Sequence, residues 1–101
     1  MAAAWYEANG FEVLARNWRI RAGEIDIIAA RPDLVVFCEV KSRTSARYGS
    51  GAEAVNWRKQ QRVRTVALRW LEQVDRHFAD MRFDVASVDG DGNIDLIEGC
   101  F

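Results

Sequence analysis

Residues 23–41 decide the fold of this chain: Gly-Glu-Ile-Asp-Ile-Ile-Ala-Ala-Arg-Pro-Asp-Leu-Val-Val-Phe-Cys-Glu-Val-Lys. Two runs rich in isoleucine and valine, residues 23–30 and 34–41, flank Pro32-Asp33. Proline followed by aspartate suits a tight turn, so the two runs are predicted to pair as a hairpin. The nearly continuous apolar start of the second run is typical of a strand that is covered on both faces of its sheet.

The flanking sequence extends this hairpin into an α/β domain. Gly10 ends a short helical segment, and the residues after it alternate as in a strand. A later segment carries apolar side chains at helical spacing, and a turn rich in glycine and aspartate joins two final strand patterns. This α-β-β-β-α-β-β order predicts a mixed five-stranded sheet with flanking helices. The predicted elements are a helix over 2–9, strands over 11–20, 23–30 and 34–41, a loop over 42–51, a helix over 52–78, and strands over 82–88 and 94–97.

Length and composition limit the class of protein. A chain of 101 residues is one domain, and half of its residues are apolar, as in a folded rather than a disordered chain. No apolar run approaches the roughly 18 residues that span a bilayer, and the N-terminus lacks the basic and apolar regions of a signal peptide. Two cysteines are too few for a disulfide scaffold. We therefore expect a single domain over residues 1–101, in the cytoplasm and without a membrane partner.

Candidate catalytic residues lie in the hairpin. Glu39 and Lys41 project to the same side of their strand because strand side chains alternate. A two-residue turn places Asp26 opposite Glu39, with Cβ atoms roughly 4.5–5.5 Å apart. Two carboxylates this close repel each other unless a cation lies between them, and Mg²⁺ or Mn²⁺ suits oxygen ligands of this kind. A cross-strand ladder of ion pairs on an exposed sheet face is the structural alternative.

This set of side chains predicts metal-assisted hydrolysis of a phosphodiester. Asp26 and Glu39 would hold the metal ion, and Lys41 would position the attacking water or offset the developing negative charge. Lys59 points inward near the start of the second helix, so the hairpin carboxylates are its expected partners and it becomes a further site cation. Extension of its side chain to the rim of the helix is the alternative.

Basic residues gather in one part of a chain whose net charge is −1. Residues 41–69 contain eight basic residues and one acid, a net charge of +7, and the remainder carries −8. Arginine suits bidentate contacts with phosphate, and tryptophan offers a stacking surface for an unpaired base. A solvated helix edge, with Trp57 packed on the preceding loop, is the alternative. DNA is the expected partner, and the expected nucleic-acid contacts are Arg43, Arg47, Trp57, Arg58, Arg62 and Arg69.

Several stretches follow the order of a known family: Arg16-Asn17-Trp18-Arg19, Gly23 to Ala29, Val36 to Arg43, Tyr48-Gly49, Lys59, Arg82 to Val85, and Cys100-Phe101. In these stretches the chain resembles the YraN family of uncharacterised bacterial proteins, which are similar to PD-(D/E)xK nucleases and archaeal Holliday-junction resolvases. The resemblance implies a restriction-endonuclease-like core with Asp26, Glu39 and Lys41 at the nuclease positions. It also makes a homodimer of the resolvase kind an expectation.

One feature departs from the family pattern. The first helix of the family usually begins earlier and carries a Gly-Glu pair upstream of the Ala-Ala that matches Ala2-Ala3. We expect either a truncated first helix or a metal site with one acid fewer. Glu24 is a candidate replacement because it lies two residues before Asp26 on the same face. An ion pair with Arg19 or Arg21 is its structural alternative.

Three functions fit these features. The first is a metal-dependent nuclease acting on DNA, including branched DNA, and the second is a catalytically weak or inactive nucleic-acid-binding module of the same fold. The third is a protein-interaction domain in which the cluster of acids and lysine is structural. The complete set of Asp26, Glu39 and Lys41 favours the nuclease over the interaction domain, whereas the missing first-helix acid favours the binding module. Metal binding at Asp26 and Glu39 is required by the nuclease alone.

Overall fold

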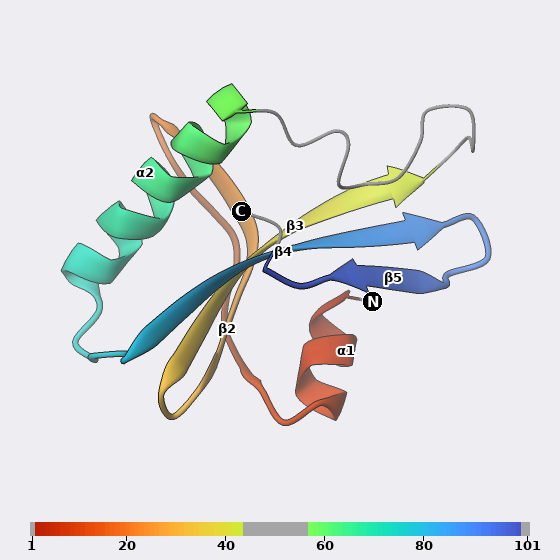
Figure 1. The fold of residues 1–101 in the computed structure, drawn as a ribbon, viewed down its shortest axis with the longest axis horizontal. Helices are drawn as coiled ribbons and strands as arrows, with labels where there is room; N and C mark the ends of the chain where they lie inside the picture. The colour runs from red at the N-terminus through yellow and green to blue at the C-terminus, as the bar shows by residue number, and fades with distance from the viewer. Residues whose placement is uncertain (1, 44–56, 100–101) are drawn as a thin grey trace.

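The computed structural model describes residues 2–43 and 57–99. They form an α/β domain in which one five-stranded sheet, in the order β1-β2-β3-β4-β5, has a helix on each face (Figure 1). The predicted order of elements is confirmed. The helices and strands are α1 (Ala2–Ala8), β1 (Glu12–Ile20), β2 (Gly23–Arg31), β3 (Leu34–Arg43), α2 (Trp57–Gln73), β4 (Asp80–Asp89) and β5 (Ile94–Ile97).

The sheet is mixed because β3 is antiparallel to one of its neighbours and parallel to the other. It pairs antiparallel with β2 and parallel with β4, whereas the pairs β1–β2 and β4–β5 are antiparallel. Short turns join the antiparallel neighbours, but the parallel pair needs a crossover, and this crossover contains α2. Pairing of Arg31 with Leu34 confirms the predicted two-residue turn at Pro32-Asp33.

Each helix closes one face of the sheet with its own apolar core. On one face Tyr6 of α1 packs in the same cluster as Cys38 of β3. On the other face Trp70 of α2 packs edge-on against Phe37 of β3, with ring centroids 5.9 Å apart. Burial of a large apolar side chain contributes about 1.5–3 kcal/mol to folding, so the helices are held mainly by these contacts. The coverage of both faces explains why β3 is apolar at consecutive positions.

The second helix ends earlier than predicted. Its last residue is Gln73, whereas the apolar spacing predicted a helix through Phe78, and residues 52–56 of that prediction lie outside the described residues. Phe78 stacks on Trp70 from a segment after the helix, with ring centroids 6.4 Å apart, and therefore keeps the apolar spacing of the helix without belonging to it. The chain has to leave the helix here because β4 begins at Asp80.

β3 and β4 are each at least two residues longer than predicted, and β2 is one residue longer. β3 continues through Arg43, so Ser42 and Arg43 of the predicted loop belong to a strand, and residues 44–51 lie outside the described residues. β4 begins at Asp80, which pairs with Leu34, because parallel pairing extends over the whole of β3. No helix within residues 2–43 and 57–99 is long and apolar enough to cross a membrane.

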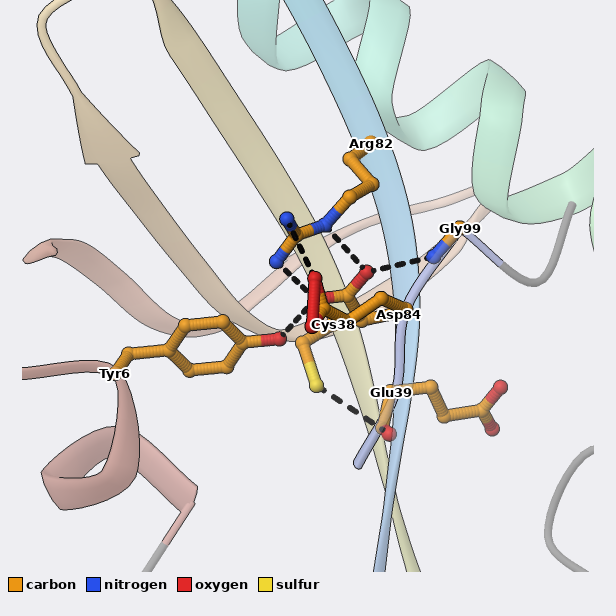
Figure 2. Close-up of polar contacts among 7 residues, drawn as sticks. Tyr6, Cys38, Glu39, Arg82, Asp84 and Gly99 are labelled. Atoms are coloured by element: carbon orange, nitrogen blue, oxygen red, sulfur yellow. Dashed lines mark hydrogen bonds and ion pairs between the residues drawn. The ribbon is translucent and has the colours of Figure 1, made fainter. Parts of the chain in front are cut away.

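A buried carboxylate ties both ends of the described chain to β4 (Figure 2). Asp84 is fully buried, and its Oδ2 accepts a 2.6 Å hydrogen bond from the hydroxyl of Tyr6 in α1. Arg82 donates to both carboxylate oxygens at 2.9 Å, and the amide of Gly99 donates to Oδ1 at 3.0 Å. A buried charge is stable when it is paired and hydrogen-bonded in this way, so Asp84 has a structural role.

Candidate functional site

The candidate site lies where β2 and β3 separate. Counted from the turn, their backbone pairing ends at Ile27 and Cys38. Beyond that pair the carboxylate of Asp26 bridges the strands, because its Oδ2 accepts a 2.7 Å hydrogen bond from the amide of Val40. The side chain thus satisfies a backbone donor that lacks a strand partner, and it holds Asp26 beside the strand that carries Glu39.

An irregularity in β2 opens the hairpin at Asp26. Ile25 packs in the core under α2, whereas Ile27, two residues later, packs in the core under α1. Regular alternation would place both side chains on one face, so the backbone rotates between them. This rotation leaves the Asp26 carboxylate between the strands.

Glu39 and Lys41 project from β3 toward α2. The thiol of Cys38 and the carboxylate of Glu39 point to opposite sides of the strand (Figure 2). Lys41 Nζ lies 3.7 Å from Glu39 Oε1, and Nζ of Lys59 in α2 forms an ion pair with the same oxygen. The structure thus contains the expected contact between Lys59 and a hairpin carboxylate. The other oxygen, Glu39 Oε2, is buried and has no hydrogen-bond partner among the described residues.

Burial and neighbouring charges shift the pKa values of Asp26 and Lys41. Burial raises the pKa of Asp26, and the neighbouring carboxylates of Glu24 and Glu39 raise it further, against a backbone amide that lowers it. Contact with Lys59 and burial lower the pKa of Lys41, against the attraction of Glu39. Three carboxylates and two amines therefore interact at this end of the sheet.

Glu24 is shared between an arginine and the acids of the site. Its Oε2 lies 2.7 Å from Nη2 of Arg19 and accepts a 2.9 Å hydrogen bond from Nε of the same residue. The ion pair with Arg19 that was the structural alternative is therefore present. Glu24 is thus engaged by an arginine outside the candidate set, whereas Glu39 is engaged by Lys41 and Lys59 within it.

A cleft of about 480 Å³ opens beside Asp26. It extends from Ala2 and Ala3 of α1 across β1 to Lys41 of β3. Its β1 wall includes Asn17, whose φ of 50° is a left-handed conformation that asparagine tolerates better than most residues. The cleft provides a route by which a ligand can reach Asp26 and Lys41.

Four of the residues expected to contact nucleic acid, Trp57, Arg58, Arg62 and Arg69, belong to α2. Trp57 has 71% of its surface exposed, and the preceding loop on which the alternative would pack it lies outside the described residues. Arg58, Arg62 and Arg69, the three expected contacts among the arginines of α2, are all exposed. Arg47 and the side chain of Arg43 lie outside the described residues.

Known proteins match this sequence over most of its length. The family model of the uncharacterised protein family UPF0102 matches residues 1–88. The chain belongs to the UPF0102 family. A UPF0102 protein of Parafrankia sp. (strain EAN1pec) is 54% identical over 88 residues, which cover 87% of this chain and 75% of the relative. A UPF0102 protein of Myxococcus xanthus (strain DK1622) is 44% identical over 103 residues, covering 99% of this chain and 82% of the relative.

The UPF0102 match includes the whole candidate site. It extends from α1 through most of β4 and therefore contains Asp26, Glu39, Lys41 and Lys59. The expected membership of the YraN family is confirmed, since YraN proteins make up the UPF0102 family.

The UPF0102 site suits a hard divalent cation that has few protein ligands. In residues 2–43 and 57–99, no group of three or more His, Cys, Asp or Glu side chains is arranged to hold a metal ion. Asp26 and Glu39 supply two carboxylates, and Mg²⁺ commonly binds one or two carboxylates together with waters and substrate phosphate. The buried, unpartnered Oε2 of Glu39 fits such an ion, because a buried carboxylate oxygen without a partner is costly.

Ser87 is a candidate residue that the sequence did not indicate. It pairs in register with Lys41 across β3 and β4, so the two side chains project to the same face of the sheet. Ser87 is 1% exposed, and its hydroxyl has no hydrogen-bond partner within the described ranges. A lone serine in an apolar strand carries no sequence signal, and its neighbours become apparent only from the strand register.

Proposed function

We propose that this UPF0102 protein is a metal-dependent nuclease that hydrolyses phosphodiester bonds in DNA on a restriction-endonuclease-like core. The observation that carries the proposal is the pairing of Glu39: lysines contact one carboxylate oxygen, while the other is buried and has no hydrogen-bond partner among the described residues. Asp26 lies on the neighbouring strand, where its carboxylate accepts a hydrogen bond from the amide of Val40, the residue after Glu39. Acids on two strands with a lysine two residues after one of them form a minimal set for metal-assisted phosphodiester hydrolysis.

Each side chain has its own role in this reaction. Asp26 and Glu39 hold Mg²⁺ or Mn²⁺, which when bound polarises the phosphate and acidifies a water molecule. The amine of Lys41, 3.7 Å from Glu39 Oε1, orients that water or offsets negative charge on the phosphate as its P–O bond breaks. The amide of Val40 keeps Asp26 from turning away.

The outer side of α2 supports nucleic acid as the substrate. Arg58 and Arg62 are exposed there and suit phosphate contacts, and the exposed ring of Trp57 suits stacking on an unpaired base. So few phosphate contacts would give one chain a dissociation constant for DNA in the non-specific range, roughly 10⁻⁴ to 10⁻⁶ M. A homodimer that engages two strands of a branched DNA therefore forms part of the proposal.

Nicking of supercoiled plasmid DNA tests the proposal. The wild-type protein should nick the plasmid in Mg²⁺ or Mn²⁺, and Lys41→Ala should abolish nicking while leaving the circular dichroism spectrum unchanged. Arg76→Gln is the matched control, because Arg76 bonds the Arg31 carbonyl at the far end of the hairpin. Equal nicking by wild type and Lys41→Ala, or no nicking in either metal, contradicts the proposal.

A nucleic-acid-binding module without efficient chemistry is the second candidate. Lys59 already neutralises Glu39, and the described ranges offer no cluster of three or more ligating side chains. Such a module binds DNA equally well in EDTA and in Mg²⁺ and cleaves it in neither. Binding of labelled DNA measured in both conditions, next to the nicking assay, separates the two functions.

A further inference from the structure

Lys59 joins the candidate metal site to a second cavity. Its ammonium forms an ion pair with Glu39, and the same residue lines a cavity of about 190 Å³ between the start of β2 and α2. Arg62, one turn further along α2, and Glu24 of β2 line this cavity as well. The side chain of Lys59 therefore contacts Glu39 of the candidate site and also lines a cavity whose wall contains Arg62.

We propose that Lys59 is an exchangeable counterion: it neutralises Glu39 in the metal-free protein and, when a divalent cation takes that carboxylate, its ammonium binds a DNA backbone phosphate in the adjoining cavity together with Arg62. This inference rests on the proposed nuclease function. It names the contact through which metal binding and phosphate binding are coupled.

Charge competition supports the exchange. The ammonium groups of Lys41 and Lys59 both approach Glu39 Oε1, and a divalent cation on the same carboxylate repels them strongly even near a protein surface. Lys41 belongs to the same strand as Glu39 and cannot withdraw far. Lys59 reaches across from α2 on a long, flexible side chain and already lines the second cavity, so it is the cation placed to move into that cavity.

The lining of the cavity supports phosphate as the ligand. Arg62 is exposed, and no ion pair holds its guanidinium within the described part of the chain. A guanidinium provides bidentate contacts and an ammonium a point charge, a combination that suits phosphate oxygens. The acid in the wall, Glu24, pairs with Arg19 at 2.7 Å, which weakens its repulsion of an anion. Because the cavity adjoins the acids of the site, the phosphate belongs to the strand that is cleaved.

The test measures two affinities that should change in opposite directions. Mn²⁺ binding is followed by the electron paramagnetic resonance of the free ion, and DNA binding by anisotropy of a labelled, nuclease-resistant phosphorothioate duplex in Mn²⁺. Lys59→Met should bind Mn²⁺ about tenfold more tightly, since it removes a positive charge next to the ligand, and should bind the duplex about tenfold more weakly. Lys59→Arg should keep both affinities close to wild type.

Arg76→Met is the control for loss of an arginine charge away from the site. Arg76 follows the end of α2 at Gln73 and donates to the Arg31 carbonyl beside the turn of the hairpin, so its removal should leave both affinities unchanged. Thermal melting verifies that each variant is folded, and Lys59→Gln replaces the methionine variant if that one is not.

Several results overturn the inference. Mn²⁺ affinity in Lys59→Met that equals or falls below wild type refutes the exchange, because a lysine that merely holds Glu39 in place predicts weaker binding. Unchanged duplex affinity in Lys59→Met refutes the phosphate contact. Absence of Mn²⁺ binding in both proteins refutes the exchange and the metal site together. Failure of the proposed function alone looks different: the affinities change as stated, but no protein nicks DNA.

Discussion

The hydroxyl of Tyr6 donates a 2.6 Å hydrogen bond to the carboxylate of Asp84, 78 residues further along the chain. The bond holds α1 against β4, and Arg82 neutralises the same carboxylate from β4 itself (Figure 2). Ala2 and Ala3 at the start of α1 form one wall of the cleft beside the candidate site. The buried network therefore fixes that wall, although none of its members belongs to the site.

Removal of the Asp84 charge should destabilise the fold strongly. Asp84→Asn is expected to lower the free energy of unfolding by about 3–5 kcal/mol, because it leaves Arg82 without its buried partner. Tyr6→Phe removes one hydrogen bond to a charged acceptor and should cost about 1.5–3 kcal/mol. Urea denaturation measures both values, and an Asp84→Asn variant as stable as wild type would contradict a structural role for this acid.

The thiol of Cys38 should be inert in the native protein. Burial raises its pKa to about 12 from an ordinary value of 9.0, so the folded state favours the protonated thiol. The contribution of the protonated Cys38 thiol to the free energy of unfolding is therefore complete below pH 9.0, and it is lost as the pH rises toward about 12. In a Cys100→Ser background, Ellman's reagent at about pH 8 should react with the denatured but not the native protein. Rapid reaction of the native protein would show that the α1 face of β3 is open.

The hairpin was predictable because local chemistry and packing agree there. Pro32-Asp33 suits a two-residue turn, the flanking runs are β-branched, and the register observed at Arg31 and Leu34 is the one that the turn imposes. The end of α2 was not predictable in this way. Phe78 keeps the apolar spacing of the helix but reaches the same core from a non-helical segment, so periodicity alone could not distinguish the two.

Within the site, the predictable features follow from regular geometry. Alternation places Glu39 and Lys41 on one face, and helical angle turns Lys59 inward toward them. The hydrogen bond between Asp26 and the amide of Val40 was not predictable, because it depends on an irregularity of β2 that regular strand geometry excludes. The register of Lys41 with Ser87 was not predictable either, because it depends on the order of the strands in the sheet.

Replacement of Ser87 by alanine should stabilise the protein. Its hydroxyl is buried without a partner among the described residues, so Ser87→Ala removes a desolvated polar group and should raise the free energy of unfolding by about 1 kcal/mol. Ala86→Ser serves as the opposite change on the other face of β4 and should destabilise. Destabilisation by Ser87→Ala, measured in urea, would show that the hydroxyl has a partner.

The exposed arginines of α2 should determine the salt dependence of DNA binding. Double charge reversal, Arg58→Glu with Arg62→Glu, should make the log–log salt slope less steep by about two units, because each phosphate contact releases about one counterion. Fluorescence anisotropy of a labelled duplex over a range of salt concentrations gives the slope. An unchanged slope in the double variant would make this side of α2 a solvated edge with no role in binding.

Paramagnetic broadening of backbone amide signals by Mn²⁺ tests most directly whether Asp26 and Glu39 hold a divalent cation. At low Mn²⁺, the account predicts that the NMR signals of Asp26, Glu39 and Val40 broaden first, and that Asp26→Asn removes this effect. The β4–β5 turn provides an internal comparison, because Asp89 there is engaged by the amides of Asp91 and Asn93. Broadening that begins at this turn, or that is uniform along the chain up to millimolar Mn²⁺, would contradict the metal site and with it the proposed nuclease.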